Sequence, residues 1–320
     1  MTGLYENASS HSSFVLFSGF GQVGGPVRPL FVLFLFLMLL VSLSANSLLL
    51  FVIVCQRSLH TPMCVLIGAM ACVDLAVPLF FFPDVLLGVL LPSRGISLSG
   101  CLFQMFFLHL FGSLQSTLLF LMALDRLFAI CRPLSYHERT SPGRFLRAAA
   151  PLLLRNLLMV SVVVRLAASR SYCSGNVIRH CVCEHMALVE LACGDTAVNS
   201  LVGLTAVFVV SVLDFLLILA SYVVIFCSVL RPGRDGSRAL RTCVTHIMVI
   251  SVTLTFALAA FLSYRVRDGL SAPARVAVSA VYLFLPSCFN PIIYGVRTTE
   301  IRRHIVKTLR RPVRGSHRLT

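Results

Sequence analysis

Two adjacent charged residues, Asp125 and Arg126, stand at the end of a long apolar stretch and have the chemistry of a releasable ion pair. A neighbouring carboxylate can hold a guanidinium in place until a conformational change frees it to contact a partner. An isolated Asp-Arg pair is more simply interpreted as an ion pair that anchors one end of a helix. The residues that accompany the pair therefore decide between these two interpretations.

A proline inside the last apolar stretch supplies a candidate joint. Pro291 lies in the run NPIIY, which begins at Asn290 and ends at Tyr294. Proline within a helix frees a carbonyl group and permits a kink, and the Asn290 side chain can satisfy the exposed backbone groups. Such a joint can take two arrangements. Three other apolar stretches each carry a polar residue that belongs with this set: Asn46, Asp74 and Tyr222.

Two residues could bind an acidic ligand at the end of the bundle that lies opposite the Asp125-Arg126 pair. His109 lies eight residues after Cys101, which is about 12 Å along a helix and on nearly the same face. Arg265 lies 24 residues after Arg241, about 36 Å along its helix. A guanidinium at a partly dehydrated mouth can pair bidentately with a carboxylate, and a deeper imidazole can donate a hydrogen bond. We therefore expect a small ligand that is acidic or strongly polar.

The neighbours of these two residues would complete the ligand site. Gly112 and Ser113 follow His109 by three and four residues and share its face of a helix. His109 should face the cavity, because an imidazole that faces lipid is costly. Phe261 would add to the apolar wall, although packing explains it equally well. Arg265 is likewise explained equally well as a solvated residue at a helix end.

Cysteines concentrate in the segment 165–195, which holds four of the twelve in the chain. This concentration predicts disulfides on the outside of the cell. The favoured pairs join Cys101 to Cys183 and Cys173 to Cys193, and they leave Cys181 over.

The same segment offers donors for a metal ion. His180, Glu184 and His185 could hold zinc or copper, because imidazoles and a nearby thiolate suit these ions. The disulfide interpretation is stronger, because Cys183 is the best partner for Cys101. We therefore predict no metal site.

The composition shows that these residues must be positioned within a membrane. Hydrophobic residues make up 58% and charged residues 12% of the 320, against roughly 45–50% and about 25% in a soluble domain. One span takes about 20 apolar residues. Seven stretches meet or approach this length: about 30–55, 61–91, 95–124, 148–164, 196–230, 242–264 and 276–296. The fourth is the weakest, because Arg155 interrupts it. The predicted fold class is all-α, a seven-transmembrane helix bundle.

The arginines and lysines give the bundle its orientation. Of the 27, 18 lie in the segments 55–62, 126–147, 231–241 and the tail from 297, and eight lie on the opposite side. Positive residues concentrate on the cytoplasmic side, so the N-terminus is expected outside. There the triplet at Asn7 could be N-glycosylated. The net charge of +15 indicates this asymmetry and attraction to anionic membrane lipids, and not nucleic-acid binding.

The chain is expected to have three parts: an extracellular N-terminus (1–29), a seven-helix transmembrane domain (30–296) and a basic cytoplasmic tail (297–320). Residues 298–310 have the spacing of an amphipathic helix that lies on the inner leaflet. The sequence has no internal repeat, selectivity filter or ladder of charges, so a transporter or channel is a distant alternative. Its titratable residues are scattered over several helices, so we predict neither an enzyme nor a cofactor.

The rhodopsin-like G-protein-coupled receptors are resembled, in order and spacing, by Asn46, Asp74, Cys101, the pair Asp125-Arg126 and the run from Asn290 to Tyr294. The runs LHTPM at 59–63 and MALDRLFAIC at 122–131, with Ser221-Tyr222 and the segment from Ala239 to His246, resemble the vertebrate olfactory receptors in particular. The loop 176–193 and the ending 290–302 resemble the fish-like (class I) branch. That branch is associated with water-soluble odorants and includes receptors for carboxylic acids.

The resemblance implies a multi-pass plasma-membrane receptor, in olfactory sensory neurons, that binds a small-molecule odorant and activates a stimulatory, olfactory-type heterotrimeric G protein. Arg126, held by Asp125, would engage the G protein, and Tyr222 and Tyr294 would stabilise the active arrangement. Leu127 stands where the family usually has tyrosine, which leaves the strength of coupling open.

The resemblance also implies an internal polar site. Asp74 with Asn46 would form this site, which could bind sodium, although a hydrogen-bonded packing residue explains Asp74 equally well. For the chain as a whole, the runner-up function is a receptor of the same fold for a metabolite in a non-olfactory tissue.

Overall fold

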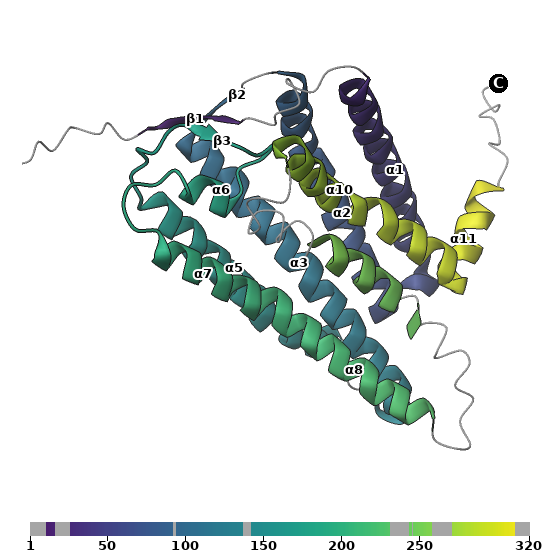
Figure 1. The fold of residues 1–320 in the computed structure, drawn as a ribbon. Coiled ribbons are helices and arrows are strands. Elements are labelled where there is room, and N and C mark those ends of the chain that lie inside the picture. The colour runs from purple at the N-terminus through teal and green to yellow at the C-terminus, as the bar shows by residue number, and fades with distance from the viewer. Residues whose placement is uncertain are drawn as a thin grey trace, which may run out of the picture.

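The computed structural model describes residues 11–16, 26–91, 94–136, 142–230, 243–244, 246–257 and 271–310. Six helical spans in this part are long and apolar enough to cross a membrane. They are α1 (Val27–Cys55), α2 (Pro62–Leu90), α3 (Leu98–Cys131), α5 (Pro142–Ala168), the span Ala197–Val229 and α10 (Ala272–Arg297). A shorter apolar helix, His246–Ala257, belongs to the remaining span. The predicted seven-helix bundle is confirmed (Figure 1).

Several helices, among them α3 and α5, are longer than the apolar stretches that the sequence predicted. α3 continues seven residues past the predicted end at 124 and includes Asp125 and Arg126 in its last turns. α5 begins at Pro142, six residues before the predicted start at 148. Arg155 lies inside α5 and does not interrupt it. The prediction from hydropathy was wrong at these ends because hydropathy detects the lipid-facing length of a helix and not its polar continuation into the cytoplasm.

The fifth membrane span changes its helical geometry near its middle. It consists of α7 (Ala197–Val207), a π-helical turn η4 (Phe208–Val212) and α8 (Leu213–Val229). A π turn adds one residue to its hydrogen-bonded ring relative to an α turn, so it rotates the residues before it relative to those after it. Asp214 lies directly after this turn.

Local sequence explains where several helices begin. Thr61 caps α2, and its hydroxyl accepts a hydrogen bond from the Cys64 amide at 3.4 Å, with Pro62 in the first turn. The hydroxyl of Ser97 accepts a hydrogen bond from the Gly100 amide at 3.2 Å and caps α3. Short 3₁₀ turns, η2 (Arg57–Leu59) and η3 (Pro133–Ser135), follow α1 and α3 on the cytoplasmic side.

A small sheet covers the outer end of the bundle. β1 (Ser13–Leu16) pairs antiparallel with β2 (Arg94–Ser97) and parallel with β3 (Val177–Ile178). Phe14 and Leu16 are buried, and the Phe14 ring lies edge-on to Tyr172 with 5.3 Å between centroids. The expected extracellular N-terminus therefore contributes a strand that holds the long outer loop against the bundle (Figure 1).

The tail contains the amphipathic helix expected from its spacing. α11 (Thr299–Leu309) follows α10 and turns away from it (Figure 1). Ile301 is buried, and Ile305 lies so close to Gly295 that a β-carbon there would come within 3.2 Å of it. A hydrogen bond of 3.2 Å joins His304 to Ser58, so α11 is attached to the first cytoplasmic turn as well as to α10.

A buried ion pair joins α5 to α8 inside the membrane. The guanidinium of Arg155 donates to both oxygens of Asp214, at 2.7 and 2.8 Å, and Asp214 is fully buried. Arg155 also donates to the hydroxyl of Thr117 on α3 at 3.2 Å and to the carbonyl of Val209 in the π turn at 3.4 Å. The Asn156 amide donates to the same hydroxyl at 2.9 Å. These bonds tie three helices together at one depth.

Removal of one partner of this pair should destabilise the fold. Arg155→Met and Asp214→Asn should each cost about 3–5 kcal/mol, because each leaves a charge in the membrane without its partner. The double variant Arg155→Met/Asp214→Asn should lose less than the sum of the two single variants. Thermal unfolding of detergent-solubilised receptor, followed by size-exclusion fluorescence, measures this. Arg165→Met on an exposed position of α5 is the matched control and should change little. Additive losses would contradict the pairing.

Candidate functional site

At the cytoplasmic end, α3 carries the Asp125-Arg126 pair. The Arg126 guanidinium lies 2.9 Å from the Asp125 carboxylate, and the Asp125 side chain is only 2% exposed. The hydroxyl of Tyr136, just after η3, donates to the other oxygen of Asp125 at 2.8 Å. Asp125 is thus held by two partners, of which the sequence had predicted only Arg126. The Asp125 carboxylate therefore holds the Arg126 guanidinium against α3.

Three polar side chains from three other helices gather beside Arg126. Tyr222 is on α8, His246 is in the helix of the sixth span, and Tyr294 ends the NPIIY run on α10; all are buried. The His246 and Tyr294 rings lie 5.7 Å apart, and the charge of Arg126 acts on both Tyr222 and His246. Among the described residues, neither tyrosine hydroxyl nor His246 Nδ1 has a hydrogen-bond partner. This cluster has unused hydrogen-bonding capacity, which is costly in a buried site.

Deeper in the bundle, Asp74 on α2 is the centre of a paired network. Its two oxygens accept hydrogen bonds from the Asn290 amide at 2.9 Å and the Gln115 amide at 2.7 Å. Asn46 on α1 donates to the carbonyl of Ser287 at 2.8 Å, next to the Pro286 position of α10. The network joins four helices. It brings Asn46, Asp74 and Asn290 together and adds Gln115, which the sequence analysis had not singled out.

At the outer end, two imidazoles face each other. His109 on α3 and His185, the first residue of α6 (His185–Val189), have ring centroids 6.4 Å apart and ring planes at 70°. The Nε2 atoms of both rings are buried and have no hydrogen-bond partner among the described residues. Burial lowers the pKa of His185 to about 4, so this ring is neutral at physiological pH. Gly203 on α7 allows the close approach, since a β-carbon there would lie 3.0 Å from the His185 ring.

The other predicted ligand residues differ in where they lie. Gly112 is on the same helix as His109 and faces the hydroxyl of Tyr282. The hydroxyl of Ser113 donates to the carbonyl of Leu110 at 2.8 Å, so its hydrogen bond stays within its own helix. Phe261 and Arg265 lie outside the described residues, as does the glycosylation candidate Asn7.

The long outer loop is held by the two disulfides that the sequence favoured, Cys101–Cys183 and Cys173–Cys193. Beside the first, the Gln104 side chain accepts a hydrogen bond from the Cys183 amide at 2.7 Å, and its amide donates to Asp84. Gln104 therefore connects α2, α3 and the loop. The left-over Cys181 is buried as a free thiol.

Two of the three loop residues that could have held a metal, His180 and Glu184, have structural partners. His180 Nδ1 accepts a hydrogen bond from the Val182 amide at 3.0 Å, and Glu184 caps α6 by accepting from the Ala187 amide at 3.0 Å. Burial, with the charge of Arg275, lowers the pKa of His180 to about 3, and burial raises the pKa of the Cys181 thiol to about 12. The described residues contain no group of three side chains that could bind a metal.

Comparisons with known proteins show which family this chain resembles. The sequence profile described as olfactory receptor matches residues 35–311. The human olfactory receptor 52K1 is 35% identical over 272 residues, covering 84% of this chain and 87% of that receptor. The human olfactory receptor 51F2 is 35% identical over 277 residues, covering 85% of this chain and 80% of that receptor.

The chain belongs to the olfactory receptor family. These relatives fit the class I branch that the outer loop and the tail resembled. The olfactory receptor described here is a multi-pass plasma-membrane protein and not an enzyme, and olfactory sensory neurons are its expected tissue.

Loss of the disulfide at the top of α3 should prevent this receptor from reaching the cell surface. Cys101→Ser or Cys183→Ser should destabilise the outer end by about 2–5 kcal/mol, since the bond ties α3 to the loop. Surface labelling of an N-terminal epitope in intact cells measures the effect. Cys181→Ala, two residues from Cys183, is the matched control and should retain most of the surface signal. Equal losses in all three variants would contradict a specific role for the bond.

Proposed function

We propose that this olfactory receptor binds a small carboxylate-bearing or strongly polar odorant at the outer end of its bundle and activates a stimulatory heterotrimeric G protein at the cytoplasmic end. The observation that carries the ligand class is the His109–His185 pair, whose Nε2 atoms are buried and unpaired among the described residues. A neutral imidazole donates from Nε2 in one of its tautomers. A ligand with two acceptor oxygens would satisfy both rings and remove the cost of two unpaired buried groups.

The charge of such a ligand needs a cation that the two imidazoles do not supply. His185 is neutral at physiological pH, because burial lowers its pKa to about 4. Arg265, predicted at the outer end of the sixth span, is the candidate for this charge. A guanidinium matches a carboxylate bidentately. The division of roles is therefore that Arg265 attracts the anion and the histidines orient it, with Gly112, Ser113 and Phe261 in the surrounding wall.

The cytoplasmic end supports coupling through a change of partners. Arg126 is held by Asp125, which Tyr136 also holds, while Tyr222, His246 and Tyr294 have unsatisfied polar atoms beside it. A shift of the sixth span, or a change at the Asn290-Pro291 joint, would let these groups exchange partners and free Arg126 for the G protein. The segments predicted to face the cytoplasm carry 18 of the 27 arginines and lysines, which favours an acidic partner surface at this end.

The Asp74 network is suited to a small cation between these two ends. The Asp74 carboxylate and Asn46 Oδ1 supply oxygen atoms, and Asn46 Oδ1 is buried without a hydrogen-bond partner among the described residues. Hard cations prefer oxygen ligands. A sodium ion at this position would hold α1, α2 and α10 in their resting arrangement.

The ligand class is tested with a cyclic-AMP reporter in cells that express the receptor. We expect responses to small carboxylic acids and weaker responses to their methyl esters. Arg265→Ala should weaken the acid response at least about tenfold, by loss of a charge-assisted bidentate pair, and leave the ester response unchanged. Arg267→Ala, two residues on, is the matched control. If acid and ester responses both survive Arg265→Ala unchanged, the carboxylate proposal is wrong.

The coupling role of Arg126 is tested by basal and stimulated cyclic AMP, normalised to surface receptor. Arg126→Ala should abolish both. Tyr136→Phe removes the hydrogen bond to Asp125 and keeps the ring, so it should weaken the hold on Arg126 and raise basal signalling by up to about tenfold. Wild-type basal signalling in Tyr136→Phe would show that Tyr136 does not restrain the pair.

A further inference from the structure

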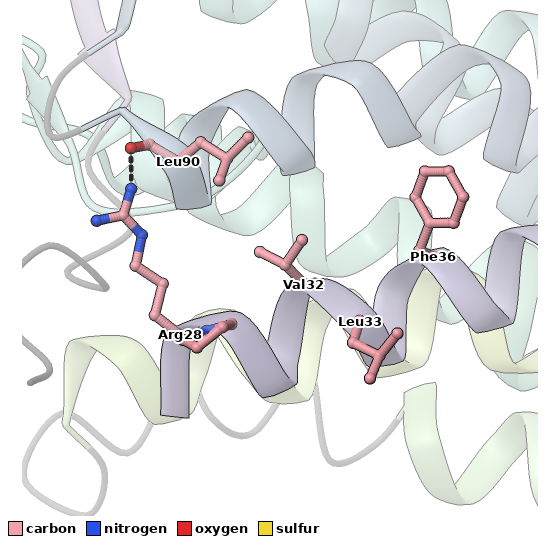
Figure 2. A pocket seen from close by; sticks show the side chains of 6 residues that line it. Arg28, Val32, Leu33, Phe36 and Leu90 are labelled. Atoms are coloured by element: carbon pink, nitrogen blue, oxygen red, sulfur yellow. Dashed lines mark hydrogen bonds between the residues drawn. The ribbon is translucent and has the colours of Figure 1, made fainter. Parts of the chain in front are cut away.

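A groove with one cation at its mouth lies between α1 and α2 at their outer ends. Its volume is about 460 Å³. Figure 2 shows Arg28 reaching the end of α2, while Val32 and Phe36 follow along α1. Six residues line the groove: Arg28, Pro29, Val32, Leu33, Phe36 and Leu90. Apart from the arginine, the lining is apolar.

The groove opens toward the membrane and not toward the interior of the bundle. Leu33 is 55% and Phe36 47% exposed, and the neighbouring Leu30 and Leu37 on α1 are exposed as well. Aliphatic and aromatic side chains exposed on a membrane-spanning helix face lipid. Whatever occupies the groove must therefore enter from the bilayer.

The depth of the lining residues matches the outer leaflet. Arg28 is the second residue of α1, at the outer boundary, and Phe36 is eight residues on, about 12 Å deeper. One leaflet provides about 15 Å of hydrocarbon. The cation thus lies at the level of the headgroups and the apolar wall lies at the level of the acyl chains.

Arg28 has one described partner and capacity for more. Its guanidinium donates to the carbonyl of Leu90, the last residue of α2, whose carbonyl lies beyond the hydrogen bonds of its own helix. A guanidinium has five N–H groups. No described carboxylate forms an ion pair with Arg28. The remaining N–H groups can bind an anion bidentately, in the manner that suits phosphate.

We propose that this groove is a binding site for a phospholipid of the outer leaflet. The lipid phosphate accepts hydrogen bonds from Arg28, and one acyl chain lies along Val32, Leu33 and Phe36. The phosphate is common to zwitterionic and anionic phospholipids, so the site needs no net negative lipid. A bound lipid joins the first turns of α1 to the last turn of α2, beside the outer loop, and stabilises the end of the bundle that faces the odorant.

The experiment is native mass spectrometry of the full receptor in detergent with dioleoyl phosphatidylcholine. Wild type should retain one lipid more than Arg28→Gln, which keeps a donor for the Leu90 carbonyl and loses the charge; the affinity should fall about tenfold. Val32→Phe, which fills the groove and keeps Arg28, should lose the same lipid. Leu30→Phe on the exposed surface of α1 is the matched control and should retain it.

Two further probes separate the possible occupants. Dioleoylglycerol has the same chains without phosphate and should not be retained, and inorganic phosphate should neither bind nor displace the phospholipid. Equal retention by wild type, Arg28→Gln and Val32→Phe, equal retention of dioleoylglycerol, or displacement by free phosphate would each overturn the proposal. Size-exclusion profiles identify the variants that fold. Val32→Phe keeps Arg28 and its hydrogen bond to the Leu90 carbonyl, so it tests the lipid site even if Arg28→Gln does not fold.

Discussion

Hydrocarbon offers no hydrogen-bonding partner, so each polar group inside the membrane has to be satisfied by another part of this receptor. At the middle depths the two carboxylates meet this requirement. Asp214 accepts both arms of Arg155, and Asp74 accepts the Asn290 and Gln115 amides. At the two ends it is not met. The Nε2 atoms of His109 and His185 are buried without a hydrogen-bond partner at the outer end, and so are the hydroxyls of Tyr222 and Tyr294 at the cytoplasmic end, among the described residues. A partner that binds beside an unpaired buried group stabilises it, so these two ends are where the proposed ligand and G protein would gain most by binding.

α3 takes part in every one of these networks, which makes it the element through which the ends can communicate. The Cys101–Cys183 disulfide fixes its outer end, and Thr117 and Gln115 bond to the two paired networks at mid-depth. From His109 to Arg126 is 17 residues, about 25 Å along the helix. With α3 so anchored, we expect the sixth span and the Asn290-Pro291 joint to be the elements that change arrangement. We therefore place the coupling between the two ends in these elements, because coupling requires an element with two arrangements that both ends can favour differently.

The sequence predicted what hydropathy and charge report, and missed what depends on the rotation of helices. The spans, the orientation and the tail helix follow from local composition, and the cysteine pairs from their distribution. Arg155, in contrast, was interpreted as an interruption, because a charge in an apolar stretch is costly unless its partner is known. Its partner Asp214 is 59 positions away. The sequence did contain a signal for this pair, because two consecutive predicted spans each hold a charged residue, Arg155 and Asp214, and the two charges are opposite. His185 was considered only as a metal ligand, since nothing local shows that the loop folds back over His109.

The Arg155–Asp214 pair and the π turn before Asp214 form one local structure that reaches as far as the ligand end. Arg155 donates to the carbonyl of Val209, inside the turn, while it holds Asp214 just after the turn. Gly203 is eleven residues before Asp214, about three turns of a regular α-helix, so without the π turn both would lie on nearly the same face. The extra residue of the π turn rotates α7 and brings Gly203 under the His185 ring, where no side chain larger than hydrogen fits without displacement. The ion pair in the membrane therefore helps to decide which face of the fifth span lies against the His185 ring, at the proposed odorant site.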